Sequence, residues 1–182
     1  MARLPYVDPE TAPEAVRDAL ARLPVKLNIF RMMAHAETSF RPMLSLGMSI
    51  LTQQELSAKL RELVILRVGS LSSARYEWVQ HVPIALAVGA TDAQVAALER
   101  GDIAEPFDEL ERVVLRFTTE VVKQVRASDE TFAAVAKLLP PRQIVELVLT
   151  IGYYMTIARL LESTAVDLDP PAGTSIIDAN RR

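Results

Sequence analysis

Apolar residues recur along almost the whole chain at the spacing of an α-helix, every three or four positions. This periodicity, together with residues that favour helix ends, predicts helices over residues 13–23, 28–36, 39–52, 57–70, 73–88, 91–100, 108–126, 128–139 and 141–164. No segment shows the alternation of apolar and polar residues that a half-buried strand would need. The pattern therefore predicts an all-α fold.

Several helix ends are marked by residues with specific preferences. Ser73 is predicted to cap the helix that stops before Gly89, and Thr91 with Gln94 forms a capping-box pattern. The tail from Asp167 contains two prolines and a glycine, and we expect it to be irregular and to pack on a neighbour.

Two of the predicted helices carry similar sequences. The segment Arg61-Glu62-Leu63-Val64 in helix 57–70 is echoed by Val145-Glu146-Leu147-Val148 in helix 141–164. Each begins an apolar helix that follows a shorter amphipathic one. The echo predicts a duplicated helical unit.

Length and charge narrow the classes of protein to which the chain can belong. Its 182 residues predict one domain over residues 1–182, and the net charge of −3 argues against a nucleic-acid or anionic-membrane surface. Apolar runs are interrupted by charges well before the roughly 20 residues of a membrane span, and no signal-peptide pattern opens the chain. We therefore expect a soluble, cytoplasmic protein that binds a small molecule.

The composition also excludes several kinds of chemistry. There is no cysteine, so these residues hold no disulfide, thiolate metal site or thiol-based redox centre. There is no G-x-G-x-x-G or P-loop motif for a nucleotide cofactor. The sequence predicts a protein without a cofactor.

A histidine and two glutamates are the strongest candidates for catalysis. Glu77 and His81 are four residues apart, on one face of helix 73–88, where a carboxylate can orient the imidazole and raise its pKa. Glu62 precedes the apolar run of helix 57–70, and a short link at 71–73 should bring it to the depth of His81. The three side chains are predicted to converge in apolar surroundings suited to general acid–base catalysis.

Other interpretations of these residues stay open. Glu77 can simply complement the helix dipole, Glu62 can pair with Lys59 one turn away, and His81 can be a core histidine. The same three side chains could instead ligate a divalent metal ion, although their spacing matches no standard metal motif.

Aromatic residues and one arginine complete the set of candidates. Tyr76, Trp78 and Tyr153 lie in or near the predicted core and are candidate substrate contacts, with packing as the alternative. Arg67 interrupts an apolar run and is the best candidate for a buried ion pair.

These motifs resemble the carboxymuconolactone decarboxylase family, which includes alkyl hydroperoxidase D. The resemblance rests on Arg61-Glu62-Leu63-Val64, on Tyr76-Glu77-Trp78-Val79-Gln80-His81, and on Pro141 to Val148 with Gly152-Tyr153-Tyr154; it spans about residues 40–165. It implies an alkyl hydroperoxidase D-like helical fold, peripheral N- and C-terminal segments, and a homotrimer or homohexamer.

The resemblance also separates two chemistries. The hydroperoxidase branch carries two cysteines before the histidine, and alignment on His81 places those positions at Ala74 and Glu77, which excludes thiol peroxidase activity. The decarboxylase branch carries a glutamate four residues before the histidine, as here. We expect a lyase acting on a small unsaturated lactone or carboxylic acid, with His81 as proton donor, Glu77 orienting it and Glu62 stabilising charge or relaying the proton. The alternative is a non-catalytic oligomer or small-molecule-binding protein of the same fold.

Overall fold

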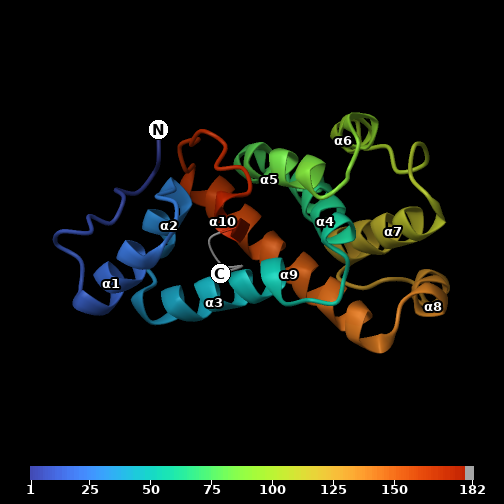
Figure 1. Ribbon diagram of the computed structural model, residues 1–182, viewed down its shortest axis with the longest axis horizontal. Coiled ribbons are helices and arrows are strands. Elements are labelled where there is room, and N and C mark those ends of the chain that lie inside the picture. Colours follow the sequence, from blue (N-terminus) through green and yellow to red (C-terminus); the bar gives the residue numbers. More distant parts are fainter. Residues whose placement is uncertain (179–182) are drawn as a thin grey trace.

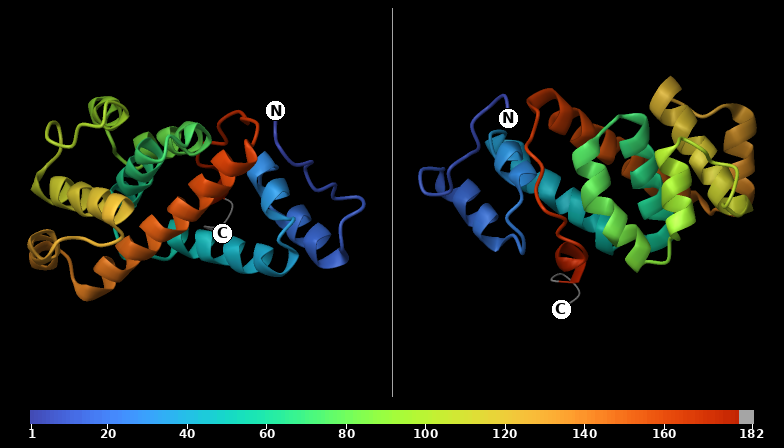
Figure 2. Two further views of the ribbon diagram at one scale, coloured as in Figure 1. Left: turned by 180° about the vertical axis from the view of Figure 1, so that it is seen from behind. Right: turned by 90° about the horizontal axis from the view of Figure 1, so that it is seen from above.

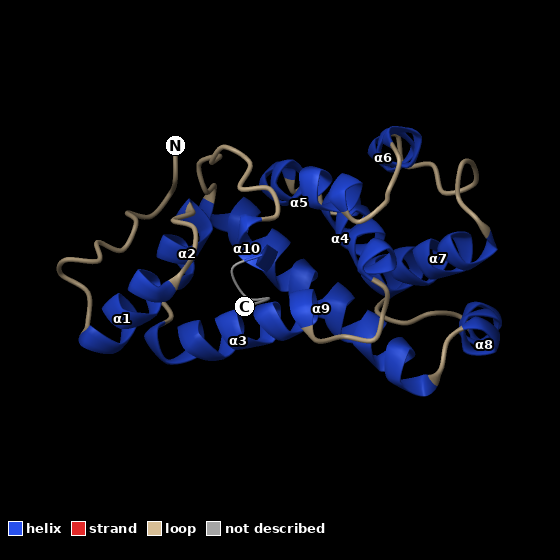
Figure 3. Ribbon diagram, viewed as in Figure 1, coloured by secondary structure: helices blue, strands red, loops and turns tan. Residues whose placement is uncertain are grey.

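The helices predicted from the periodicity are present in the computed structural model, which describes residues 1–178 (Figure 1; Figure 3). Within that range no strand is found, so the predicted all-α class is confirmed. The helices are α1 (Glu14–Arg22), α2 (Asn28–Met33), α3 (Glu37–Thr52), α4 (Ala58–Leu71), α5 (Arg75–Ala87), α6 (Asp92–Glu99), α7 (Glu109–Gln124), α8 (Asp129–Leu138), α9 (Pro141–Thr164) and α10 (Ser175–Asp178). The short α10 lies in the tail, for which no helix was predicted.

Helix α4 is the centre of the molecule. Every residue from Leu60 to Gly69 is buried, because α5, α7 and α9 pack around this helix. The hydroxyl of Ser57 accepts a hydrogen bond from the backbone N–H of Leu60 and so caps the helix. A helix that is apolar on nearly every face is stable only when it is covered on nearly every face.

Three apolar clusters form the interior of the molecule. The first joins α4 to α7, α8 and α9; the second joins α1, α2 and α3 to the end of α9; the third lies between α4, α5 and α6. Helices α1–α3 therefore lie on one side of the molecule and α6–α8 on the other, with α4, α5 and α9 between them (Figure 1). The candidate residues belong to this middle layer.

Helix α9 is long and apolar enough to cross a membrane by length and composition alone. Half of its most apolar stretch is buried within the protein, and it runs between the two sides of the molecule (Figure 2). We therefore interpret α9 as a core helix of a globular protein.

The link between α4 and α5 differs from the prediction. Ser73 does not cap α5: it adopts a left-handed backbone conformation with φ of 53°, and Ala74 is the N-cap residue. The backbone N–H of Ala74 bonds to the carbonyl of Gly69, which closes a tight turn. Reversing the chain in so few residues requires a positive φ, and this requirement overrides the capping preference of serine.

Candidate functional site

Helix α5 presents one face to a cavity. Tyr76, Glu77, Gln80, His81 and Ile84 recur at helical spacing along this face, and all of them line the cavity. The cavity has a volume of about 130 Å³. Its remaining walls come from α2, α3, α9, the segment between α1 and α2, and Gly173 of the tail.

The lining is mainly aliphatic. Of the described residues that form it, none is a lysine or arginine, and the polar groups lie on α5 and α9. The apolar side chains come mainly from the N-terminal part of the chain and include Leu23, Val25, Leu27, Ile29, Phe30, Met33, Leu44, Met48 and Leu51. The N-terminal segment, expected to be peripheral, is therefore part of the cavity wall.

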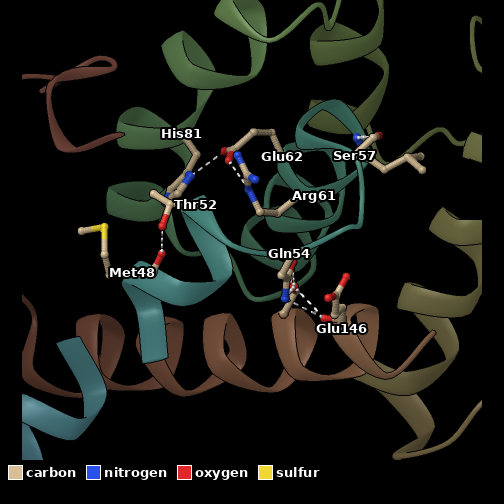
Figure 4. A network of polar contacts seen from close by, with 10 residues as sticks. Met48, Thr52, Gln54, Ser57, Arg61, Glu62, His81 and Glu146 are labelled. Carbon is tan, nitrogen blue, oxygen red and sulfur yellow. Dashed lines mark hydrogen bonds and ion pairs between the residues drawn. The ribbon is translucent and has the colours of Figure 1, made fainter. Parts of the chain in front are cut away.

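Glu62 of α4 binds His81 of α5 directly. The Glu62 Oε2 atom lies 2.8 Å from His81 Nδ1, and Arg61 Nε donates to Glu62 Oε1 at 3.1 Å (Figure 4). Glu62 is fully buried and the side chain of His81 is 12% exposed. An ionised carboxylate only accepts hydrogen bonds, so Nδ1 of His81 carries the proton of this bond. The Nε2 atom makes no hydrogen bond to the described residues and remains available to a ligand.

Glu77 does not orient His81, which corrects the prediction from their spacing. Its carboxyl group instead lies against α4, where a Cβ added to Gly69 would be 3.3 Å from Glu77 Oε1. Both carboxyl oxygens are buried, and neither has a hydrogen-bond partner among the described residues. Burial, with a smaller effect from the charge of Glu62, raises the pKa of Glu77 well above its ordinary value.

Two adjacent tyrosines of α9 complete the polar side of the cavity. The ring of Tyr154 meets the ring of His81 edge to face, with 4.9 Å between centroids. Burial raises the pKa of Tyr154 well above its ordinary value and raises that of Tyr153 to about 12, so both are neutral phenols. Tyr153 donates to the carbonyl of Met43 at 3.2 Å and leaves no space for a side chain at Gly47.

The predicted aromatic contacts divide into two groups. Tyr76 and Tyr153 line the cavity, whereas Trp78 does not. Trp78 packs into the third cluster with Leu63 and Leu66 of α4. Trp78 is therefore packed between α4 and α5 and does not reach this cavity.

The tail is bound to its own chain, a contact that sequence reasoning missed. The Gln80 side chain donates to the carbonyls of Asp169 and Pro170 and accepts from the N–H of Ala172. Tyr76 donates to the Asp169 carboxylate, which also accepts from the backbone N–H of Asn28 at 2.7 Å. The tail, expected to pack on a neighbour, thus follows α5 and brings Gly173 to the cavity wall. No local signal marks a contact between residues about 90 positions apart.

The ion pair expected for Arg67 and two of the alternatives left open for the glutamates are not found among the described residues. Arg67 is buried but forms no ion pair within residues 1–178; it donates to the hydroxyl of Thr119 and the carbonyl of Gly101. Lys59 pairs with Glu111 at 2.7 Å and not with Glu62. In the part of the chain that the structure describes, no three histidine, aspartate or glutamate side chains are grouped to hold a metal ion.

Comparison with known proteins relates the helices that carry the candidate residues to a known family. Residues 38–120, which contain α4 and α5, match the model of the carboxymuconolactone decarboxylase family. No curated protein matches the sequence. The fold is similar to that of several solved structures over nearly its full length.

Two of these structures are peroxidase-related proteins. One, from Silicibacter sp. TM1040, is 17% identical with a TM-score of 0.77; the other, an alkylhydroperoxidase AhpD core protein from Ralstonia eutropha JMP134, is 15% identical with a TM-score of 0.79. Each alignment covers 92% of this chain and 92% of the other.

A third similar structure is an enzyme with a bound ligand. It is a cysteine-to-alanine variant of the debrominase Bmp8 in complex with 2,3,4-tribromopyrrole, 17% identical with a TM-score of 0.75 over 98% of this chain and 99% of that one. The family match covers the helices that carry Glu62, Glu77 and His81, and the fold extends the likeness to the whole chain. Residues 38–120 of the chain are therefore similar to the carboxymuconolactone decarboxylase family, and the protein has an alkyl hydroperoxidase D-like fold.

Proposed function

We propose that the protein is a cofactor-free lyase that acts on a small unsaturated lactone or carboxylic acid by general acid–base catalysis. The observation that carries the proposal is the hydrogen bond between Glu62 and His81 at the wall of an apolar cavity. A carboxylate that fixes one ring nitrogen of a histidine leaves the other nitrogen oriented for proton transfer. The non-catalytic alternative would be favoured by an exposed His81 with no cavity around it, and His81 is mostly buried.

The reaction divides into bond cleavage and proton delivery. The bond between the ring carbon and the carboxylate breaks, carbon dioxide leaves, and the electron pair is delocalised into the conjugated lactone carbonyl. His81 then gives a proton to carbon from Nε2, and a proton from water restores it. Glu62 holds the imidazole in place and stabilises its cationic form, which is the positioning role that the spacing had suggested for Glu77.

The surroundings favour this chemistry over thiol chemistry. With no cysteine in the 182 residues, these residues supply no thiol for peroxide or disulfide reduction. The apolar lining removes water from a substrate carboxylate, and loss of carbon dioxide turns that charge into a delocalised one. His81 is the one residue among the described lining residues whose side chain can carry a positive charge, so the cavity suits at most one negative charge.

The direct test is incubation with carboxymuconolactone and with a butenolide that carries a single carboxyl group, while carbon dioxide release is followed. Loss of His81 or of the Glu62 carboxylate (His81→Ala, Glu62→Gln) should lower kcat by at least 100-fold, the usual contribution of a general acid. His35→Ala and Glu130→Gln are matched controls, since both residues are exposed. Turnover that is unchanged in the His81 and Glu62 variants would overturn these roles.

We also propose that the chain assembles into a homotrimer or homohexamer, as the family resemblance implies. Apolar side chains on one part of α9, those of Val145, Val148 and Leu149, are between 44% and 59% exposed. Side chains of this kind are commonly covered by another subunit. Light scattering of the purified protein, with Val148→Lys as the variant that should shift the mass toward the monomer, tests the assembly.

A further inference from the structure

Glu77 stands out from the other buried polar residues. Its two carboxyl oxygens are the only buried side-chain nitrogen or oxygen atoms within the described residues that lack a hydrogen-bond partner. Buried polar groups in native proteins are nearly always hydrogen-bonded. Glu77 lines the cavity, so a turn of its side chain away from Gly69 would bring the carboxyl group to a partner that arrives with a ligand.

The groups around Glu77 keep it in the acid form. Glu62 faces it from α4 and Tyr154 from α9, while His81 lies one turn further along α5. The guanidinium of the buried Arg61 is bonded to Glu62, and no ion pair of Glu77 is found among the described residues. A carboxyl group that is buried beside another carboxylate, with no cation of its own, holds its proton.

We propose that the carboxyl group of Glu77 donates a hydrogen bond to a carbonyl oxygen of the substrate, which apart from that carbonyl and the carboxylate that leaves is apolar and about the size of a single ring. The size follows from the cavity of about 130 Å³, since an apolar cavity of roughly 150 Å³ accommodates benzene. The chemistry follows from the donor: a protonated carboxyl group offers one O–H to an acceptor such as a lactone carbonyl.

This inference rests on the proposed function. It identifies the group that stabilises the electron pair left behind when carbon dioxide departs. When carbon dioxide leaves, the electron pair moves onto the carbonyl oxygen, and the O–H of Glu77 stabilises the negative charge there. His81 delivers the proton to carbon, so the two side chains have separate tasks. Glu77 is then a catalytic residue that acts as a donor throughout, and the Glu62–His81 pair moves the proton.

Two substitutions test whether Glu77 acts as a hydrogen-bond donor. Glu77→Gln retains an uncharged group that can donate, whereas Glu77→Met fills the same space without one. The probes are 2(5H)-furanone, a neutral lactone, and cyclopentene, a ring of the same size without an acceptor. Dissociation constants are measured by NMR titration of the folded protein.

The expected result is a specific loss for the lactone. Glu77→Met should weaken furanone binding about tenfold, the upper range for a single hydrogen bond, while Glu77→Gln stays within about threefold of the wild type. Cyclopentene should bind all three proteins with similar affinity. Equal furanone binding by the wild type and Glu77→Met overturns the proposal, and so does an equal loss in both variants.

Infrared difference spectra give a second readout without any ligand. The wild type minus Glu77→Gln should show the carbonyl band of a protonated carboxylic acid near neutral pH. A carboxylate band in its place would mean that Glu77 is ionised and would overturn the proposal. Neither measurement needs turnover, so a failure to decarboxylate lactones would contradict the proposed function and leave the role of Glu77 to be judged on binding.

Discussion

Glu62 and Glu77 are two glutamates buried in the same helix pair, and they differ in what surrounds them. Glu62 accepts hydrogen bonds from Arg61 and His81, whereas Glu77 has no hydrogen-bond partner within residues 1–178. Both side chains are almost completely inaccessible to solvent. Burial alone therefore does not determine the state of a carboxyl group, and the donors within reach do.

The difference assigns different tasks to the two residues. A carboxylate with two donors can remain charged inside a protein and can hold a histidine in one orientation. A carboxyl group without donors keeps its proton and becomes a donor itself. One helix pair thus supplies a fixed negative charge and a neutral acid a short distance apart, which is the arrangement that acid–base chemistry requires.

Removal of the Glu62 carboxylate is expected to cause the largest change in the free energy of unfolding. Glu62→Leu leaves the guanidinium of Arg61 buried without its partner, and breaking a buried pair in this way costs about 3–5 kcal/mol. Urea denaturation of the wild type and the variant measures the change in the free energy of unfolding.

Glu130→Leu is the matched control, because Glu130 is exposed and its removal should change stability by less than about 0.5 kcal/mol. A Glu62→Leu variant as stable as this control would show that the Arg61–Glu62–His81 group contributes little to the fold.

Substitution of Glu77 should have the opposite sign. Glu77→Met replaces a buried group without partners by an apolar side chain of similar size, and the removed penalty is about 1–3 kcal/mol. The variant should therefore unfold at higher urea concentration than the wild type while it loses affinity for the lactone probe. Such an exchange of function for stability is typical of functional sites. A destabilised Glu77→Met protein would indicate that Glu77 has a structural partner.

Helical periodicity is sufficient to predict some features of the helices that carry these residues. The bounds of α9 and the shared depth of Glu62 and His81 follow from apolar spacing and a short link, and the structure agrees with both. The direction of the Glu77 side chain does not follow, because residues four apart share a helix face without having to touch. Here the space left by Gly69 on α4 receives the carboxyl group, and that space depends on how the two helices pack.

The pH dependence of stability gives a further test of Glu77. Its pKa is raised in the folded protein, so the acid form stabilises the fold at pH values below about 4.3, the ordinary glutamate pKa, and this contribution is lost as the pH rises toward the folded pKa. Relative to Glu77→Gln, the wild type should lose up to about 1.4 kcal/mol of unfolding free energy per pH unit between pH 5 and pH 7. Because the variant shares every other titrating group, parallel curves for the two proteins would contradict the raised pKa.

The smallest expected effect concerns the tail, which binds the face of α5 that also carries Glu77 and His81. Gln80→Ala removes the side chain that bonds to Asp169, Pro170 and Ala172, yet the released backbone groups lie near the surface and can bind water. The free energy of unfolding should therefore fall by only about 1 kcal/mol, whereas the amide hydrogen of Ala172 should exchange much faster. Gln124→Ala, at an exposed position of α7, should change neither quantity. If Ala172 remains protected in Gln80→Ala, then the contacts of Asp169 with Tyr76 and Asn28 are sufficient to hold the tail. The part of the cavity wall that the tail supplies would then not depend on Gln80.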